Sequence, residues 1–444
     1  MPFYEKKIHF YKFSDIIQPM LVEFSAKNFR SINEKQTISF LPVKAKSSGI
    51  EKGELPNNIT SESIPLLKTI ILFGKNASGK SNLLKAIRRL QILVIQSGSI
   101  SPETKIPYDP FKLDKNKTNE STTFEIKFLI KETVFRYKIV FNQTQFLLEE
   151  LYSNKAKLFV RHHGKTINFG PSLHGPKKAI EKLTGENQLF LSKAGTNNFE
   201  EFKEIYHFLT SINIRINISD EIHKSWDYYL DNLAKAIPQK TAEQFIINIL
   251  KAADVGIESF GYKKREEKEF KFPEGMPEDI KETILSQNRL ALKTIHKRFA
   301  NGDEEDTTDF AIEEESDGTL MFLKTTIRTL ISISTGSPLI IDELDINLHP
   351  KLVEVILDLF HSQNNKNGQL IFTTHNTLFL SKKYFRRDQI YFADKEENGS
   401  SEFYSLAAIE GIRPDAPYDK WYMSGKFGAV PLTSIEEITN NFIT

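Results

Sequence analysis

The chain has 444 residues, 39% of them hydrophobic, which is enough for two or three domains with separate cores. Its 59 Lys and Arg residues balance 58 Asp and Glu residues, and a net charge of +1 excludes a global field that would draw it onto nucleic acid or membranes. The absence of cysteine excludes disulfides, thiolate metal sites and a cysteine nucleophile. We see neither a secretory segment nor an apolar run of about 18 residues, and therefore expect a soluble cytoplasmic protein without a membrane partner.

The first part of the chain has an α/β pattern. Residues 1–19 are charged and aromatic and are expected to form an N-terminal extension. Expected strands at 20–32, 36–43 and 69–73 precede an amphipathic helix at 81–95. Residues 122 to about 160 are rich in β-branched and aromatic residues, which predicts an antiparallel meander.

The second part begins with a helical pattern, from about residue 177 to 286, which predicts a separate helical lobe. The α/β pattern then resumes in expected helices and strands at 320–333, 337–343, 349–362, 368–375 and 388–394. The α/β fold is therefore expected to be interrupted by an insertion and then continued.

The stretch GKNASGKS begins at Gly74 and matches G-x-x-x-x-G-K-[ST] in full. In such a loop the glycines let backbone N–H groups point at phosphate oxygens, Lys80 reaches the β and γ phosphates, and Ser81 can bind magnesium. A surface Gly/Ser turn is the alternative, which the strand before and the helix after the loop disfavour. The expected nucleotide-binding residues here are Gly74, Asn76, Ala77, Ser78, Gly79, Lys80, Ser81 and Asn82.

An acidic pair, Asp342 and Glu343, follows the apolar run at 339–341. This places two carboxylates at the carboxyl end of a buried strand, where α/β folds bind their ligands. We expect Asp342 to hold magnesium through its water shell and Glu343 to orient and deprotonate an attacking water. An ordinary turn is the alternative, and the phosphate loop favours the catalytic interpretation.

A second strand end carries Thr373, Thr374 and His375. His375 could donate a hydrogen bond to the γ-phosphate or to the attacking water, and the alternative is a cap of the next helix. If the two strands are adjacent and parallel, His375 lies beside Glu343, which favours a role in the active site.

Ser316, Asp317, Gly318 and Thr319 open an apolar helix. Ser316 is a normal N-cap, so this stretch by itself indicates only a helix start. A helix N-terminus is also an anion site, and the chain already has a phosphate loop elsewhere. The stretch therefore predicts contact with the nucleotide of a second subunit.

In this order, GKNASGKS, ESDGT, LIIDELDINLHP and TTH resemble the motifs of ABC-class ATPase heads of the SMC, RecF and OLD type. The opening VEFSAKNFRSI is similar to the first strand of that family, which implies that Arg30 lies near the nucleotide. The resemblance covers most of residues 20–394. It implies an ATP- and Mg²⁺-dependent ATPase that forms head-to-tail homo-oligomers, with Ser316, Gly318 and Thr319 completing the partner's site. ESDGT in place of LSGGQ, and His349 in place of an Asp, favour the RecF/OLD branch over transporters.

This chain is expected to form a compact head with a helical insertion. In that respect it also resembles the ATPases of bacterial phage-defence and abortive-infection systems, such as the PARIS ATPase and the Septu-type ATPases. That resemblance implies a switch or scaffold that controls a separate effector, a Toprim-type nuclease or a toxin, in response to a phage-derived trigger protein. The expected organisation is an N-terminal extension (1–19), an N-terminal ATPase lobe (20–160), a mainly helical insertion (161–295) and a C-terminal ATPase lobe with tail (296–444).

Two further functions remain open. Residues 153–182 hold seven Lys or Arg residues and one acidic residue, which permits a RecF-like DNA-repair ATPase, although a solvated face is the simpler explanation. The spacing of Arg289 and His296 permits a nuclease motif, but a structural role of these two residues is favoured.

Gln143 is a candidate for the glutamine that senses magnesium, but an ordinary loop role is favoured. Residues 301–317 hold nine acidic residues and no basic one, which indicates a solvated acidic face.

Overall fold

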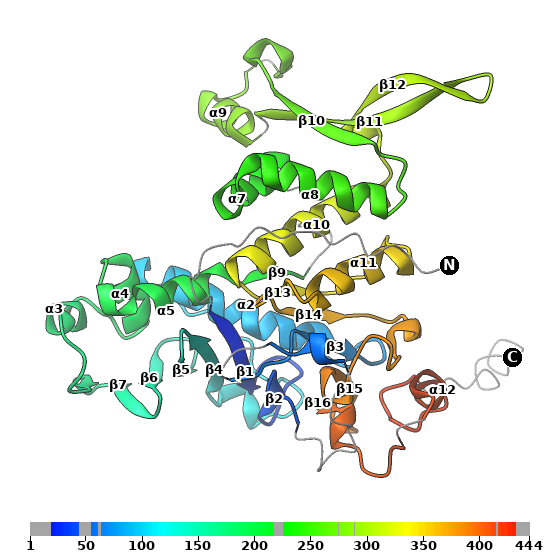
Figure 1. Cartoon of the computed structure of the whole chain (residues 1–444). Coiled ribbons are helices and arrows are strands. Elements are labelled where there is room, and N and C mark those ends of the chain that lie inside the picture. The colour runs from blue at the N-terminus through cyan, green and yellow to red at the C-terminus, as the bar shows by residue number, and fades with distance from the viewer. Residues whose placement is uncertain are drawn as a thin grey trace, which may run out of the picture. The chain divides into compact units, whose positions relative to one another are not determined.

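The structure is a computed structural model that describes residues 19–43, 55–60, 64–216, 225–273, 275–287, 289–413 and 416–431. Residues 1–18 of the expected N-terminal extension lie outside the described residues. The chain divides into two compact units (Figure 1). Unit 1 is built mainly from Asn213–Ile340 and Leu344–Leu370, and unit 2 from Leu21–Ile212, Ile341–Glu343 and Ile371–Thr444.

One sheet has six strands in the order β16-β15-β3-β14-β13-β9. Their bounds are β3 Thr69–Phe73, β9 Asn213–Arg215, β13 Leu339–Ile341, β14 Leu370–Thr373, β15 Ile390–Lys395 and β16 Ser401–Ser405. β15 pairs parallel to β3 and antiparallel to β16. Every residue of β3, β13 and β14 is buried, which explains why these strands are continuous apolar runs in the sequence.

A second sheet of seven strands lies in unit 2, in the order β2-β1-β4-β5-β6-β7-β8. Its strands are β1 Met20–Lys27, β2 Gln36–Ser39, β4 Thr122–Ile130, β5 Thr133–Phe141, β6 Phe146–Ser153, β7 Ala156–His162 and β8 Asn168–Phe169. The pairs from β4 to β8 are all antiparallel. The expected α/β fold with an antiparallel meander is therefore confirmed.

Three helices pack with this meander in unit 2: α3 Lys177–Lys182, α4 Phe190–Thr196 and α5 Glu200–Ser211. The buried carboxylate of Glu149 on β6 accepts hydrogen bonds from the N–H groups of Phe190 (2.7 Å) and Leu191 (2.9 Å) and from the Tyr137 hydroxyl (2.9 Å). Burial raises the pKa of Glu149, although the nearby Arg161 opposes that rise. Because β6 holds the start of α4 in this way, unit 2 continues to Ile212, and the expected boundary at residue 161 falls inside it.

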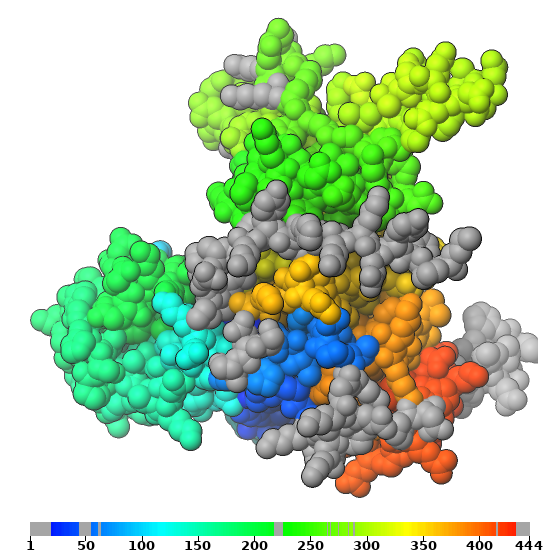
Figure 2. Space-filling view, viewed as in Figure 1, coloured from blue at the N-terminus to red at the C-terminus, as the bar shows by residue number. Residues whose placement is uncertain are grey.

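Unit 1 contains helices α7 Trp226–Ala236, α8 Gln239–Ala252, α9 Glu278–Gln287, α10 Asp317–Thr335 and α11 Pro350–His361. It also contains a three-stranded sheet in the order β10-β11-β12, formed by β10 Ser259–Lys264, β11 Leu290–Ala300 and β12 Asp303–Ala311. In the space-filling view the hairpin of β11 and β12 forms a projecting finger (Figure 2). The insertion is therefore helical only in part.

The acidic strand β12 explains why this hairpin was missed, since Asp and Glu are depleted in strands. Cross-strand ion pairs with β11 compensate the charge: Lys293 with Asp309, Lys297 with Glu304 at 2.7 Å, and Arg298 with Asp306. The chain ends, within the described residues, in helix α12 Tyr418–Met423 and a turn that runs to residue 431. No helix in the described part of the chain combines the length and the apolar composition of a membrane span.

Candidate functional site

The phosphate-loop sequence forms the turn between β3 and α2 Lys80–Gln96 in unit 2. Gly74 and Gly79 have φ angles of 152° and 106°, in the left-handed region that favours glycine. A Cβ on Gly74 would lie 2.3 Å from the Ala393 carbonyl oxygen, and one on Gly79 would lie 2.1 Å from the Ser401 hydroxyl oxygen. Both glycines are therefore required by their surroundings as well as by the turn.

Lys80 turns back over the loop. Its ammonium donates hydrogen bonds to the carbonyl oxygens of Gly74 (2.6 Å) and Lys75 (3.1 Å), and the residue is only 6% exposed. The buried hydroxyl of Ser78 in the same loop has no hydrogen-bond partner among the residues that the structure describes. An ammonium, an unused hydroxyl donor and the start of a helix in one loop fit a phosphate group, so the residues present suit a nucleotide.

Two serines from distant parts of the chain brace the start of α2. The amide of Asn82 donates to the Ser31 hydroxyl oxygen at 2.8 Å, and the Ser401 hydroxyl donates to the same oxygen at 2.7 Å. The Ser401 N–H also donates to the Ser31 carbonyl oxygen at 2.7 Å. The sequence analysis assigned no role to either serine: Ser31 lies in the VEFSAKNFRSI stretch beside Arg30, and Ser401 belongs to no motif.

The acidic pair follows β13 directly. The Thr373 hydroxyl, at the end of β14, donates to Asp342 Oδ1 at 2.6 Å and accepts a hydrogen bond from the Glu343 N–H at 2.7 Å. Glu343 has a φ of 52°, an uncommon backbone conformation that is often found at functional sites. Thr373 therefore fixes Asp342 and Glu343 relative to each other, a role that the sequence analysis did not assign.

His375 lies two residues beyond the end of β14 and is exposed. The next strand, β3, is held to the same end of β14 by the Thr374 N–H, which donates to the Leu72 carbonyl oxygen at 3.3 Å. β14 is the neighbour of both β3 and β13 in the sheet. The strand ends that carry the phosphate loop, the acidic pair and the histidine therefore meet at one edge.

Magnesium commonly binds one or two carboxylates together with substrate phosphates and water. Ser81, in the first turn of α2, and Asp342 supply such oxygen ligands within unit 2. Across the described residues, no cluster of three or more His, Asp or Glu side chains is arranged to hold a metal ion. The hydroxyl of Ser81 and the carboxylate of Asp342 are oxygen donors of the kind that binds magnesium together with a nucleotide.

The sequence of this site matches a known family. The family described as "AAA domain, putative AbiEii toxin, Type IV TA system" matches residues 70–381, more than half of the chain. The chain belongs to this family. The match begins in β3, contains the loop, the acidic pair and His375, and thereby confirms the expected P-loop ATPase class. A search of curated proteins finds no match to the chain.

Among solved structures, this AAA-family chain is similar to ATPase heads of the SMC type. An SMC head bound to the C-terminal winged-helix domain of ScpA has a TM-score of 0.46 and 16% identity, over 88% of this chain and 98% of that one. The Thermotoga maritima SMC head has a TM-score of 0.38 and 13% identity, over 87% and 98%. A head with an extended coiled coil, bound to the C-terminal domain of ScpA derived from Pyrococcus furiosus, has a TM-score of 0.42 and 15% identity, over 87% and 96%.

The expected signature lies in unit 1 of this AAA-family chain, at the start of α10. Ser316 is the N-cap, and its hydroxyl oxygen accepts a hydrogen bond from the Thr319 N–H at 3.1 Å. A Cβ on Gly318 would lie 2.9 Å from the Asn347 carbonyl oxygen, so a side chain there would crowd the backbone before α11. Ser316 is exposed and the first turn of the helix is accessible, which leaves it available to a ligand.

The residue just before the signature, Glu315, is held by the insertion. Its Oε1 lies 2.7 Å from His296 Nε2 and accepts a hydrogen bond from the Thr294 hydroxyl, both on β11. Arg289, at the start of that strand, pairs with Asp231 at 2.6 Å. The Arg289 and His296 pair therefore has structural contacts in unit 1, as favoured by the sequence analysis.

Arg30 has a φ of 53°, and its N–H donates to the Asp109 carbonyl oxygen at 2.8 Å. Its guanidinium lies 3.5 Å from the Asp109 carboxylate, which Arg89 also contacts at 2.8 Å. The next residue, Ser31, touches Asn82 of α2, so Arg30 is one residue from the braced loop.

Gln143 is exposed in the turn between β5 and β6, where its carbonyl oxygen accepts the Ile106 N–H at 2.8 Å.

The C-terminal segment of the described chain also reaches the loop. The Lys75 N–H donates to the Ala429 carbonyl oxygen at 2.7 Å, and the Lys75 ammonium lies 3.1 Å from the Asp394 carboxylate. Asp394 in turn accepts the Ala429 N–H at 2.9 Å. Burial would raise the pKa of Asp394, but hydrogen bonds from Ala429, Lys395 and Lys75 together lower it below its ordinary value.

Proposed function

We propose that this AAA-family chain hydrolyses ATP with Mg²⁺ and uses hydrolysis as a switch between an associated and a released state. The observation that carries the proposal is the arrangement of the acidic pair. Thr373 bridges Asp342 and Glu343 at the sheet edge where the loop of Lys80 begins. Such an edge is where α/β folds bind and transform nucleotides.

Each residue has a distinct role in the proposed reaction. Lys80 and Ser78 donate to phosphate oxygens, while Ser81 and Asp342 hold the metal, which supplies positive charge against the phosphates. Glu343 orients the attacking water and accepts its proton, and His375 donates a hydrogen bond near the transferred group. The loop N–H groups and the start of α2 bind negative charge without having to move.

We further infer that two copies associate head to tail. Ser316, Gly318 and Thr319 lie at the N-terminus of α10, a helix of 19 residues, and Ser316 is exposed there. Such a helix N-terminus suits an anion. In the proposed dimer it meets the phosphate bound by the loop of the other copy. Loss of the γ-phosphate would remove contacts from both copies and so favour release.

The proposed setting is bacterial anti-phage defence in the cytoplasm. The family description names a toxin and a toxin–antitoxin system, which supports a chain that controls a harmful effector. On this proposal the effector is a separate protein, a Toprim-type nuclease or a toxin, and a phage-derived protein is the trigger.

The proposal is tested with Glu343→Gln, which keeps the shape of the side chain but removes the proton acceptor. We expect ATP binding to persist, hydrolysis to fall by at least a hundredfold, and an ATP-dependent dimer to accumulate in size-exclusion chromatography with light scattering. Lys80→Ala is the matched control, because it should prevent both binding and dimerisation. If Glu343→Gln hydrolyses ATP at the wild-type rate, Glu343 is not the proton acceptor. If Glu343→Gln forms no ATP-dependent dimer, the proposed switch between associated and released states is excluded.

A RecF-like DNA-binding ATPase is the second candidate. Lys155, Lys165 and Lys182 are exposed and form no ion pair with the described residues, which favours a phosphate-contacting surface. Arg161, in contrast, donates to the carbonyl oxygens of Gln188 (2.6 Å) and Gly185 (2.7 Å) and is not a free surface charge. Steeply salt-dependent DNA binding that is lost on replacing the three lysines by Glu would support this candidate, and salt-independent binding would exclude it.

A further inference from the structure

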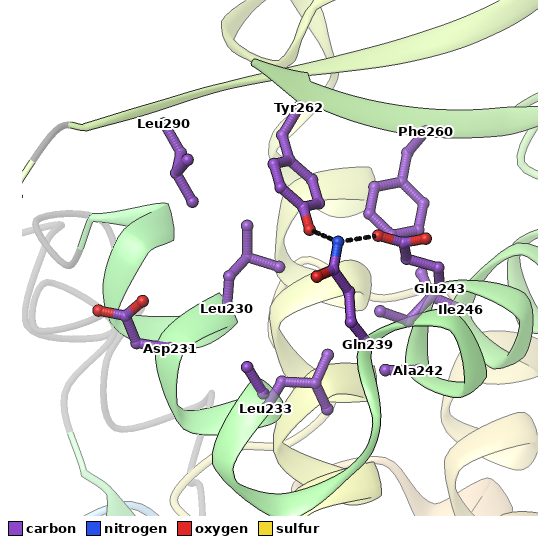
Figure 3. Close-up of a pocket in the computed structure, with 11 residues that line it drawn as sticks. Leu230, Asp231, Leu233, Gln239, Ala242, Glu243, Ile246, Phe260, Tyr262 and Leu290 are labelled. Carbon is purple, nitrogen blue, oxygen red and sulfur yellow. Dashed lines mark hydrogen bonds between the residues drawn. The ribbon is translucent and has the colours of Figure 1, made fainter. Parts of the chain in front are cut away.

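A cavity of about 220 Å³ lies in unit 1 between α7, α8, β10 and the start of β11. Figure 3 shows it in close-up, with 11 lining residues drawn. The apolar lining residues are Leu230, Leu233, Ala234, Ala242, Ile246, Phe260 and Leu290. The polar ones are Asp231, Gln239, Glu243 and Tyr262. The cavity is therefore an apolar hollow with polar groups gathered at its edge.

The polar groups at this edge are joined to one another. The Gln239 amide nitrogen donates to Glu243 Oε1 at 2.9 Å and to the Tyr262 hydroxyl oxygen. In Figure 3 the amide lies between those two side chains, and its oxygen points to the side of Leu230. Burial raises the pKa of Tyr262, and the charge of Glu243 and a hydrogen bond with Glu243 raise that pKa further.

What remains free at this edge is capacity to accept hydrogen bonds. Within the described residues, the Gln239 amide oxygen accepts no hydrogen bond. Glu243 forms no ion pair there, and besides its hydrogen bonds with Gln239 and Tyr262 its two carboxylate oxygens can accept further donors. Asp231 is different, because Arg289 pairs with it at 2.6 Å. The edge therefore suits a group that donates a hydrogen bond and accepts none.

The size of the cavity limits that group to a single side chain. Cavities for drug-sized ligands span roughly 300–1,000 Å³. An apolar cavity of about 150 Å³ holds a benzene ring, so one of about 220 Å³ suits a bicyclic aromatic ring. Tryptophan has such a ring, its N–H is a donor without an acceptor, and it is a common anchor at protein interfaces.

We propose that this cavity docks an exposed tryptophan side chain of a partner protein. The indole ring fills the space between Leu230, Leu233 and Phe260, and its N–H donates to Glu243. The proposal does not depend on ATP hydrolysis, because every residue that it uses lies in the insertion of unit 1.

The test titrates N-acetyl-L-tryptophanamide into the full-length chain, with ligand-observed NMR as the readout. The comparison probe is the benzothiophene analogue, which has the same shape but sulfur in place of the indole N–H. We expect saturable binding of the indole compound and binding of the analogue weaker by about tenfold. Equal affinity of the two probes, or no saturable binding of the indole compound, would overturn the proposal.

Three variants locate the binding. Glu243→Ala should weaken the indole compound about tenfold and leave the analogue unchanged, since it removes the acceptor. Leu233→Trp should abolish the binding of both probes, because its larger side chain fills the cavity from within. Gln244→Ala is the matched control, because Gln244 is exposed on the same helix, bonds Asn248 at 3.0 Å and does not line the cavity. If Leu233→Trp does not fold, Glu243→Ala alone tests the proposal. Weaker binding of the indole compound with unchanged binding of the analogue would support it, and an equal effect on both probes would overturn it.

A last comparison separates a side chain from a free metabolite. Indole itself lacks the amide groups that flank a tryptophan in a protein chain. Binding of both indole and N-acetyl-L-tryptophanamide supports docking of a partner's side chain. Binding of indole alone would show that the cavity excludes a peptide backbone and takes a small molecule, which would overturn the proposal.

Discussion

Thr373 donates its hydroxyl hydrogen to the Asp342 carboxylate across a distance of 2.6 Å. The same hydroxyl oxygen receives the N–H of Glu343 at 2.7 Å, so one side chain orders both members of the acidic pair. Thr373 is itself fully buried at the end of β14. Its position is therefore fixed by the sheet, and it transmits that position to two groups with proposed roles in metal binding and proton transfer.

Replacing Thr373 by Val tests this relationship. The variant keeps the branched shape but removes the hydroxyl, and with it the hydrogen bond to the Asp342 carboxylate and the hydrogen bond from the Glu343 N–H. We expect kcat for ATP hydrolysis to fall by at least tenfold and the free energy of unfolding to fall by about 1–3 kcal/mol. Thr373→Ser, which retains the hydroxyl, should stay within about threefold of wild type in steady-state assays. A wild-type rate in Thr373→Val would show that the bridge has no role in hydrolysis.

Gly79→Ala tests the close approach of two serines to the loop. The new methyl group would meet the Ser401 hydroxyl at 2.1 Å and the Ser31 hydroxyl at 2.8 Å, in a backbone conformation with φ of 106°. We expect nucleotide affinity, measured by fluorescence titration, to fall at least tenfold because the loop must shift. In the double variant Gly79→Ala/Ser401→Gly the closest clash is removed, but the strained φ of residue 79 remains. We therefore expect nucleotide affinity to recover only in part.

Mixing two inactive variants tests the head-to-tail dimer. Lys80→Ala damages the loop of one copy, and Gly318→Asp damages the start of α10 in the other. Mixed dimers would contain one intact composite site, so we expect a 1:1 mixture to regain about a quarter of wild-type ATPase activity.

Lys80→Ala mixed with Glu343→Gln is the control for that experiment. Both changes lie in the same half of the proposed composite site, so a mixed dimer contains no intact site and should remain inactive. Activity in this control, or none in the first mixture, would contradict the head-to-tail arrangement.

Arg161→Ala tests whether this residue is structural. Its guanidinium bonds two carbonyl oxygens and lies 3.7 Å from the buried carboxylate of Glu149. We expect the free energy of unfolding, measured in urea, to fall by about 2–4 kcal/mol, because the variant removes two hydrogen bonds to part-buried carbonyl oxygens and the positive charge beside the buried Glu149. Lys157→Ala, on the same strand, should change it by less than about 0.5 kcal/mol.

Asp394 should make attachment of the C-terminal segment sensitive to acid. Its pKa in the folded chain lies below the ordinary 3.8, so its contribution is complete above that pH and is lost as the pH falls through the folded value. Asp394→Asn should lower the free energy of unfolding by about 1–2 kcal/mol at neutral pH, and the difference from wild type should shrink in acid. A difference that is constant with pH would mean that ionised Asp394 does not hold Lys75 and Ala429.

The sequence by itself determined the local chemistry of this protein. Gly74, Gly79 and Lys80 follow a fixed spacing because a phosphate loop needs those conformations, and the run before Asp342 is apolar because β13 is buried on both sides. Such features depend on neighbours along the chain, and their elements were predicted where the structure has them. The antiparallel meander was also predictable, because alternation of burial, as in β4, is visible in the sequence.

Only the tertiary structure decided which distant residues serve these motifs. Ser401 and Ala429 reach the site from other segments and belong to no motif that the sequence analysis identified. Thr373 and Ser31 lie within the TTH and VEFSAKNFRSI stretches, but those stretches do not predict the hydrogen bonds of Thr373 with the acidic pair or of Ser31 with Asn82. The same reason explains β12, whose acidic residues oppose a strand until basic side chains of β11 lie opposite them. Contacts between segments far apart in the chain form only when the sheets assemble, so the composition of a single segment does not predict them.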